Sequence, residues 1–426
     1  MRALGIIVVA GCSGAAVHGP ADDAPGAVQP ERIRHYTIWM RGARIGSATE
    51  TETWSALGVR LQRDEDLRFA RGEAVVQLHA RVVVDADLGL QPARVTWSER
   101  GETPRSETAF RDGAGWHVST GAAVPADAIP GELAELVVRR DGRFVGDVFL
   151  PARGFAAGSG RIEPVAPGRF VARLTLAGDA RAESTIGPGP ASLATIDVGS
   201  DGDGLPARVV DGDGVIELRA TADEAAAPFA IVDLIAATAL PITGARHSHA
   251  LAVDTDLTLP ALPGQLARPG DAAAPDTVDL QLDASLPGAL PAGEPGADRA
   301  GDIAALVDAV RARVAPDLAA GPARPDDAAA ATAGDCTTFA LAYTSLASRA
   351  GIATRVVTGF RVDGDRLVRH RWAVSWTGRA WIAVDAAFDS VPAGGDLVGL
   401  AVTDASDAGL VAGDAALAHV RAARWR

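Results

Sequence analysis

GDCTTFALAYTSLASRAG, residues 334–351, is the stretch of this sequence that decides the fold of its C-terminal region. Gly334 frees the backbone for a tight entry, and Asp335 is placed as the N-cap of a helix. Apolar residues then recur at helical spacing, and Gly351 stands where such a helix would end. The stretch therefore predicts a helix with Cys336 in its first turn, where free N–H groups and the helix dipole favour a thiolate.

A hairpin is expected to follow this helix and to bring an imidazole and a carboxylate to the thiol. Three segments have the pattern of strands: residues 352–360, 370–376 and 381–385. Gly364 marks the first turn between them, and His370 and Asp385 would lie side by side at one edge. His370 would take the thiol proton of Cys336, and Asp385 would orient the ring and support its charged form.

Few other residues of this chain compete for these roles. The chain has two cysteines and no asparagine, and one histidine lies between Cys336 and Asp385. A lone cysteine in a helix is most often a small buried hydrophobe, and a histidine on a strand is often structural. Thiol, imidazole and carboxylate in this order together favour an acyl-transfer site over that reading.

These segments resemble the transglutaminase-like superfamily, which shares the papain-like core. The motifs that carry the resemblance are Gly334-Asp335-Cys336, Gly351-Ile352-Ala353-Thr354-Arg355, His370-Arg371-Trp372 and Val384-Asp385-Ala386. The resemblance covers about residues 300–426 and implies that Cys336 is the nucleophile, His370 the general base and acid, and Asp385 the orienting carboxylate. The sequence departs from the family pattern at Thr338-Phe339, Arg371 and Ala386, which bears on substrate preference more than on these three residues.

The N-terminus has the pattern of a bacterial lipoprotein signal. One positive charge precedes a short apolar run, and Val9-Ala10-Gly11-Cys12 is similar to a lipobox. Residues 1–12 are therefore interpreted as a signal segment with Cys12 as the lipidation site, and residues 13–30 as a flexible tether. This predicts an exported protein that is anchored by lipid to the cell envelope and faces the periplasm; an ordinary secretory signal is the alternative. If Cys12 carries lipid, Cys336 has no partner for an internal disulfide.

The sequence as a whole predicts an α+β protein of two domains. Residues 31–240 alternate apolar and polar side chains between Asp-Gly turns, which indicates an antiparallel β domain. Its opening weakly resembles the half-barrel sheets of bacterial envelope lipoproteins that hold lipids or partners. Residues 241–300 are crowded with Pro, Gly, Ala and Asp and are expected to form a linker or surface-wrapping segment. Residues 301–426, opening with a helix near 303–314, form the predicted transglutaminase-like domain.

Composition excludes some classes of function. The formal charge of −14 and a pI near 5.0 leave no basic excess for nucleic acid. The chain contains no lysine, so a lysine nucleophile or Schiff base is excluded. No phosphate loop, dinucleotide fingerprint or Gly-X-Ser-X-Gly elbow is present, so no cofactor is implied.

Three weaker patterns have both a functional and a structural interpretation. His247 and His249, with Asp254 and Asp256 nearby, favour a surface strand over a metal site, because no further ligands complete the cluster. The Asp-Gly pairs at 201–214 lack the ligand spacing of a calcium loop and are interpreted as turns. The tryptophans near the predicted triad are interpreted as core or groove walls rather than as a ligand platform: Trp372, Trp376 and Trp381.

The predicted function is a cysteine-dependent acyl-transfer enzyme that acts on amide or peptide bonds of a protein or peptide substrate through a thioester. Protease or amidase activity is favoured, and transamidation remains open because the triad does not select water or an amine as acceptor. The alternative is a non-catalytic envelope lipoprotein, in which the β domain binds a lipid or protein and the C-terminal domain is a scaffold. An activated Cys336 thiol separates the two hypotheses.

Overall fold

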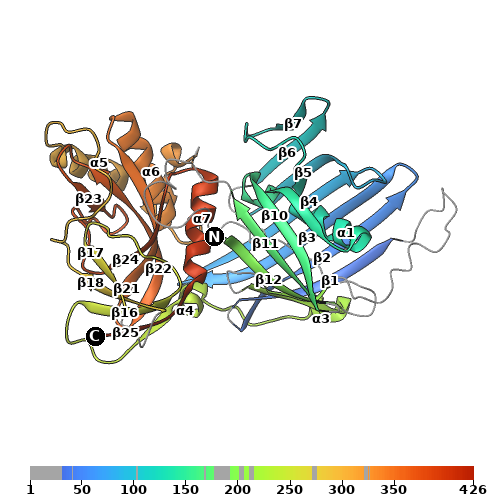
Figure 1. Ribbon diagram of the computed structural model, residues 1–426, viewed down its shortest axis with the longest axis horizontal. Helices are drawn as coiled ribbons and strands as arrows, with labels where there is room; N and C mark the ends of the chain where they lie inside the picture. Colours follow the sequence, from blue (N-terminus) through green and yellow to red (C-terminus); the bar gives the residue numbers. More distant parts are fainter. Residues whose placement is uncertain are drawn as a thin grey trace. The chain divides into compact units, whose positions relative to one another are not determined.

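The protein is mostly β, with few helices. The computed structural model describes residues 31–40, 42–101, 104–166, 169–176, 192–200, 206–210, 215–270, 276–320, 325 and 327–426. These residues fall into two compact units that divide between Ala237 and Thr238 (Figure 1). Among the described residues, no helix is both long and apolar enough to cross a membrane.

The N-terminal unit is built on one large sheet, as the period-two pattern predicts. The described strands form a 14-stranded sheet in the order β7-β6-β5-β4-β3-β2-β1-β14-β13-β12-β11-β10-β9-β8. Its pairings are antiparallel except that β8 runs parallel to β9. The strands are β1 (Arg32–Met40), β2 (Ala43–Ser55), β3 (Gly58–Arg71), β4 (Ala74–Ala86), β5 (Pro92–Arg100), β6 (Arg105–Asp112), β7 (Gly115–Val118), β8 (Ile129–Pro130), β9 (Phe144–Leu150), β10 (Ala156–Ala166), β11 (Arg169–Leu176), β12 (Ser192–Ser200), β13 (Pro206–Val210) and β14 (Val215–Ala220).

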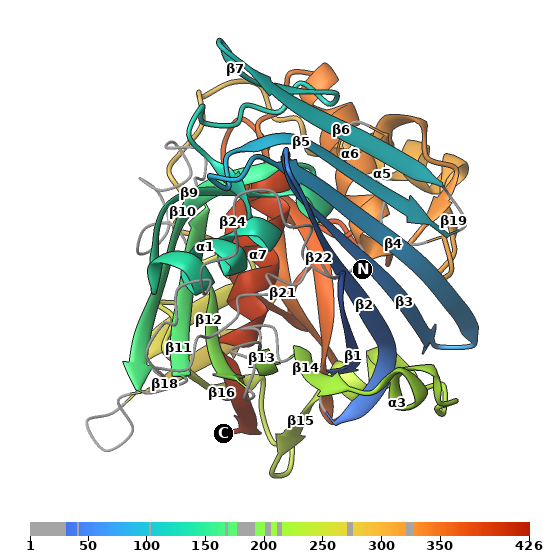
Figure 2. The same cartoon turned by 90° about the vertical axis from the view of Figure 1, so that its right-hand side faces the viewer.

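Short helices complete this unit. They are α1 (Gly131–Asp141), the 3-10 helix η1 (Pro151–Arg153), α3 (Ala222–Ala226) and α4 (Leu234–Thr238), which spans the division between the units. The sheet bends around α1 (Figure 2). The Asp141-Gly142 pair, expected as a hairpin turn, instead ends α1, because Gly142 adopts φ 75° and its N–H bonds the carbonyl of Val138.

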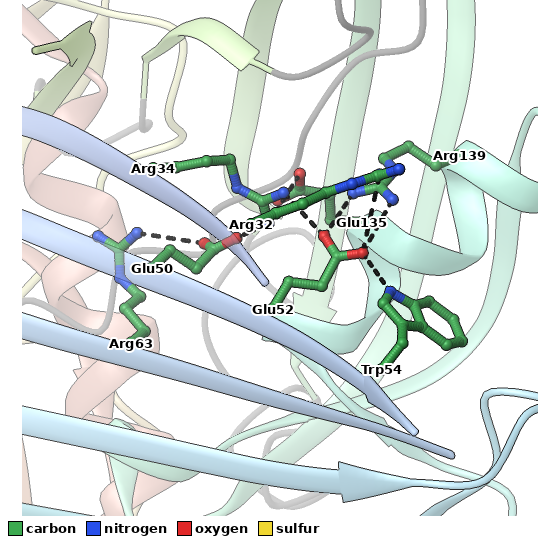
Figure 3. A network of polar contacts seen from close by, with 8 residues as sticks. All are labelled: Arg32, Arg34, Glu50, Glu52, Trp54, Arg63, Glu135 and Arg139. Carbon is green, nitrogen blue, oxygen red and sulfur yellow. Dashed lines mark hydrogen bonds and ion pairs between the residues drawn. The ribbon is translucent and has the colours of Figure 1, made fainter. Parts of the chain in front are cut away.

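A row of charged side chains lies inside this unit, where alternation alone would place apolar residues. Arg34, Glu50 and Arg63 stand opposite one another on β1, β2 and β3, and all three are almost fully buried. Arg34 bonds both Glu50 and Glu52, the latter at 2.9 Å (Figure 3). Glu52 also accepts two hydrogen bonds from Arg139 of α1, at 2.8 and 3.1 Å. Ion pairs between Glu52 of β2 and Arg139 therefore connect the sheet to α1.

Two carboxyls of this network have net pKa shifts in opposite directions. Burial alone would raise the pKa of Glu52, but hydrogen bonds from Arg139 and Trp54 lower it to about 2. Glu217 on β14 accepts a hydrogen bond from Arg63, yet burial dominates there and raises its pKa to about 7. Glu52 is therefore stabilised as a carboxylate, whereas Glu217 holds its proton close to neutral pH.

The C-terminal unit carries a second sheet with helices against it. Its described strands form a nine-stranded sheet in the order β17-β18-β16-β25-β15-β22-β21-β24, with β23 paired to β22, and a separate pair, β19–β20. The strands are β15 (Leu240–Thr243), β16 (Ala250–Thr255), β17 (Gln265–Pro269), β18 (Thr277–Leu282), β19 (Ala315–Pro316), β20 (Ala333–Gly334), β21 (Thr354–Asp363), β22 (Arg366–Trp376), β23 (Trp381–Val384), β24 (Leu397–Thr403) and β25 (Val420–Trp425). The helices are α5 (Ala300–Arg313), η2 (Ala328–Ala330), α6 (Cys336–Arg349) and α7 (Asp407–Ala418).

The segment 241–300 differs from the expected linker. It contributes β16, β17 and β18 to the sheet of the C-terminal unit. Leu251 and Val253 of β16, and Leu280 and Leu282 of β18, are buried in the same core. These strands are only five or six residues long and stand between Pro- and Gly-rich turns, so composition masks their alternation.

Replacing Glu217 with Gln is expected to flatten the pH dependence of the N-terminal unit's stability. A carboxyl whose pKa rises on folding adds stability below its unfolded value of about 4.5, and this stability is lost as the pH rises through about 7. The wild-type unit should lose more unfolding free energy between about pH 5 and pH 8 than the variant, by on the order of 2 kcal/mol. Urea unfolding read by hydrogen exchange of β1 and β14 amides measures this unit by itself.

Glu73→Gln is the matched control, because Glu73 is exposed in the turn between β3 and β4. If wild type and Glu217→Gln lost the same unfolding free energy over this pH range, the raised pKa of the buried carboxyl would be contradicted.

Candidate active site

The first turn of α6 is fixed by its cap and by a glycine. Asp335 accepts hydrogen bonds from the amide N–H groups of Thr337 (2.9 Å) and Thr338 (3.3 Å). A Cβ on Gly334 would lie 2.2 Å from the hydroxyl oxygen of Thr338, so only glycine allows this close approach. The helix therefore starts at Cys336, whose side chain is half-buried and forms no disulfide.

The body of α6 is held between α5 and the sheet. One core joins apolar side chains of both helices to β22 and β23: Ile303, Val307, Val310, Phe339, Ala342, Tyr343, Ala373 and Val384. Tyr343 also shares a hydrogen bond of 2.8 Å with Ser375 of β22. The apolar stripe read from the sequence thus faces the sheet that carries His370.

Two strands carry His370 and Asp385 to one place, as the sequence predicts. Gly364 adopts φ 60° in the turn that joins β21 to β22, and β23 then pairs with β22 so that Val384 stands opposite Ala373. Asp385 follows directly after β23. His370 Nε2 donates a hydrogen bond of 2.8 Å to Asp385 Oδ2, and both side chains are at least 96 % buried.

Cys336 interacts with the same imidazole. The Cys336 side chain raises the pKa of the His370 ring, as Asp385 does, which places the sulfur beside the imidazole. Since Nε2 is bound to Asp385, Nδ1 remains available to the sulfur. The structure therefore brings together Cys336, His370 and Asp385, with the imidazole between the other two.

The charged form of His370 is strongly favoured. Burial by itself lowers the pKa of the ring, but the hydrogen bonds to Asp385 and Cys336 and the negative charges that both can carry raise it to about 10. At neutral pH the imidazole is consequently held in its charged form.

Aromatic rings enclose the imidazole on two sides. Trp372 stacks on His370 with centroids 5.9 Å apart, and Phe388 meets it edge-on at 5.3 Å. Trp372 is buried, whereas Phe388 is 54 % exposed. Trp376 and Trp381 instead contact each other and donate their indole N–H groups to backbone oxygens of residues 294 and 291.

Arg361 contacts both neighbours of the imidazole. Its guanidinium lies 3.5 Å above the centre of the Phe388 ring, and its Nη1 is 3.9 Å from Asp385 Oδ2. Its Nε is held by Asp396 at 3.0 Å. Sequence reasoning missed both Arg361 and Phe388. Their positions in the sequence could have indicated them. Arg361 lies two residues from Gly359, which is paired with His370, and Phe388 lies three residues after Asp385.

Arg371, a departure from the family pattern, binds the elements around the site. It donates to the hydroxyls of Thr337 on α6 (3.2 Å) and Thr358 on β21 (3.0 Å). On α7 it bonds the carbonyl of Leu410 (3.3 Å) and the carboxylate of Asp414 (2.6 Å). This one buried side chain therefore links the start of α6 to a strand and to a second helix.

The weaker sequence patterns are found elsewhere. Asp254 pairs with Arg421 and Asp256 with His419, and His249 contacts Arg246 near the start of β16. Cys12 lies outside the described residues, as do the Asp-Gly pairs at 201–204 and 211–214.

A protein-family model matches part of the C-terminal unit. Residues 293–386 match the Transglutaminase-like superfamily. The matched region includes Cys336, His370 and Asp385, and it begins just before α5. No curated protein matches the chain. A crystal structure of a DUF1089 family protein from Pseudomonas aeruginosa is similar over 38 % of this chain and 88 % of that one, at 14 % identity and a TM-score of 0.24, which is too low to support an argument.

The transglutaminase-like region yields a prediction for the ionisation of His370. Asp385→Asn should lower the pKa of the imidazole from about 10 by at least about one unit. Burial lowers this pKa, and the variant lacks the carboxylate that offsets the effect of burial. NMR titration of ¹³C-labelled histidine measures the shift. Asp396→Asn is the control, since Asp396 binds Arg361 without contacting the imidazole. An unchanged titration in Asp385→Asn would show that Asp385 does not support the imidazolium.

Removing the Arg371 side chain should loosen the start of α6. Arg371→Met leaves its buried polar partners without the guanidinium and is expected to cost about 2–4 kcal/mol of unfolding free energy. Hydrogen exchange should accelerate in the first turn of α6 and in α7. The comparison variant is Arg366→Met on the same strand, where the side chain is 56 % exposed and the loss should be below about 0.5 kcal/mol. Equal effects of the two variants would contradict the linking role of Arg371.

Proposed function

We propose that the protein is a cysteine-dependent acyl-transfer enzyme that acts on amide or peptide bonds. The observation that carries the proposal is the His370 imidazole, which bonds Asp385 through Nε2 at 2.8 Å and whose pKa is raised by the neighbouring Cys336 side chain. The match of residues 293–386 to the transglutaminase-like superfamily supports cysteine-dependent chemistry in this region. In this proposal the C-terminal unit is a transglutaminase-like domain of the papain-like α+β kind.

The residues are suited to a thioester mechanism. The Cys336 thiolate attacks the carbonyl carbon of the substrate, and the imidazolium of His370 gives its proton to the departing amine nitrogen as the C–N bond breaks. Neutral imidazole then takes a proton from water, whose oxygen attacks the thioester, and the C–S bond breaks to restore the thiolate. Water is the favoured acceptor, and an amine following the same path would give transamidation.

The start of α6 supports the charges that develop in these steps. The carboxylate of Asp335 accepts from the N–H groups of Thr337 and Thr338, so the cap does not use the N–H of Cys336. That N–H belongs to the helix terminus, where amides lack intrahelical partners, and we assign it to the substrate oxyanion. Asp385 holds the ring orientation throughout.

The location of the enzyme is part of the same proposal. Lipidation at Cys12 would anchor the chain to the cell envelope on the periplasmic side, and residues 13–30 would act as a tether. The N-terminal unit, as a half-barrel-like sheet, would position a protein or peptide substrate or an envelope partner.

Alkylation of Cys336 by iodoacetamide tests the activity. In Cys12→Ser, Cys336 is the only thiol of the full chain, so modification reports on it alone. We expect rapid alkylation at about pH 6, well below the ordinary thiol pKa of about 8.5, and a loss of roughly tenfold or more in His370→Ala. His419→Ala is the matched control, because this histidine pairs with Asp256 away from the site. A rate that follows an ordinary thiol and is indifferent to His370 would overturn the enzyme and favour a scaffold whose N-terminal unit binds a lipid or protein.

A further inference from the structure

Phe388 is an exposed aromatic residue held in one position beside the imidazole. Its ring is 54 % exposed, although Arg361 covers one face at 3.5 Å and His370 meets it edge-on at 5.3 Å. A singly exposed apolar side chain on a protein surface needs no explanation by itself. Here, however, two defined contacts fix the ring and leave the remaining surface open to solvent.

The loop that carries Phe388 is closed on itself. Asp385 and Ser390 exchange two backbone hydrogen bonds of 3.0 Å, and the N–H of Phe388 bonds the carbonyl of Asp385 at 3.3 Å. Asp389 adopts φ 55°, a conformation that is strained for a non-glycine residue. Its carboxylate is 3.5 Å from Arg311 of α5. The loop thus accepts backbone strain while presenting a ring to solvent.

Arg361 makes this ring rigid. Asp396 holds its Nε at 3.0 Å, so the guanidinium is fixed independently of the ring that it covers. Stacking of an arginine guanidinium on a phenyl face is favourable at a partly exposed site. A ligand can therefore use the uncovered surface of Phe388 without first ordering the side chain.

The imidazole defines which part of a substrate lies nearest to Phe388. In acyl transfer, the imidazole must reach the nitrogen of the departing amine in order to protonate it. An amine that attacks the thioester occupies this same position, because the reverse reaction passes through the same transition state. The group attached to that nitrogen therefore lies on the His370 side of the bond, and Phe388 is an exposed residue in ring contact with His370.

We propose that Phe388 forms the wall of the amine subsite and selects amines that carry an apolar group next to the reacting nitrogen. This inference rests on the proposed function, and it names the amine that the enzyme prefers as leaving group or as acyl acceptor. Arg361 is a positioning residue in this subsite, since it acts through the ring of Phe388. Recognition is by burial of apolar surface against the phenyl ring.

Aminolysis of an acyl-enzyme tests the subsite. Full-chain Cys12→Ser is acetylated at Cys336 with p-nitrophenyl acetate, and benzylamine or 2-methoxyethylamine is then added over a range of concentrations. The amine nitrogen attacks the thioester carbon, its proton passes to His370, and the C–S bond breaks to give the N-substituted acetamide and the thiolate. The rate of amide formation, read by mass spectrometry, gives the preference for benzylamine over the polar amine after correction for the uncatalysed reaction of each.

Phe388→Ala should reduce this preference roughly tenfold, because the rate with benzylamine should fall by a larger factor than the rate with the polar amine. Phe388→Leu, which keeps an apolar wall, should retain part of the preference. Phe110→Ala is the matched control, because Phe110 is 51 % exposed in the N-terminal unit. Arg361→Gln should lower the preference by a smaller factor than Phe388→Ala does.

Two results would overturn the subsite without affecting the proposed function. One is a preference for benzylamine that is unchanged in Phe388→Ala. The other is an equal fall in the rate with both amines, because the substitution would then act through His370. Failure of the proposed function is distinct, since Cys336 would then not be acetylated faster in Cys12→Ser than in Cys12→Ser with His370→Ala.

Discussion

The guanidinium of Arg371 lies where three elements of the C-terminal unit meet, and the geometry of the candidate site depends on it. Its hydrogen bonds reach α6, β21 and α7, and its own strand carries His370 one residue earlier. The thiol and the imidazole come from elements that do not pair with each other through backbone hydrogen bonds. A planar group with several donors can fix such elements together, and a lysine ammonium at this position could not match its geometry.

The N-terminal unit uses buried charge differently. Arg34, Glu50 and Arg63 form a row across three strands, and each charge is opposite a partner of the other sign. Such a row adds less stability than its contacts imply, because removing ions from water is costly. It does specify register, since a slip of one residue would turn the whole row to the opposite face of the sheet. Long strands of alternating pattern otherwise have few features that distinguish one register from the next.

Several features could be predicted from the sequence because they depend on local chemistry. Glycine at a tight turn and aspartate at a helix cap act through the local backbone alone. Gly334 and Asp335 therefore locate the start of α6, and Gly364 locates the β21–β22 turn. The antiparallel N-terminal sheet follows from period-two alternation, and the transglutaminase-like match lies where the motifs indicated. Cys336, His370 and Asp385 meet because these elements are short and consecutive.

What the sequence did not reveal depends on contacts between distant residues. Arg34 and Glu50 look like surface residues until the sheet pairs them in its interior. The short strand β16 pairs with β25, which lies far along the chain, and β18 and β17 follow β16 in the same sheet. Phe388 looks like one more apolar side chain until Arg361, from another strand, is found against it. Alternation and composition contain no information about such partners.

The loop of six consecutive residues from Asp385 to Ser390 carries two side chains that both contact the imidazole. Asp385 orients the imidazole, and Phe388 faces solvent beside it, while the same pair of backbone hydrogen bonds fixes both. Insertions or deletions in this loop would displace the carboxylate together with the ring. Divergence among relatives of this protein is therefore constrained: substitution at position 388 or 361 can change the exposed surface, whereas the loop length must stay constant. If the proposed function holds, substrate preference at this position would evolve by side-chain replacement rather than by loop remodelling.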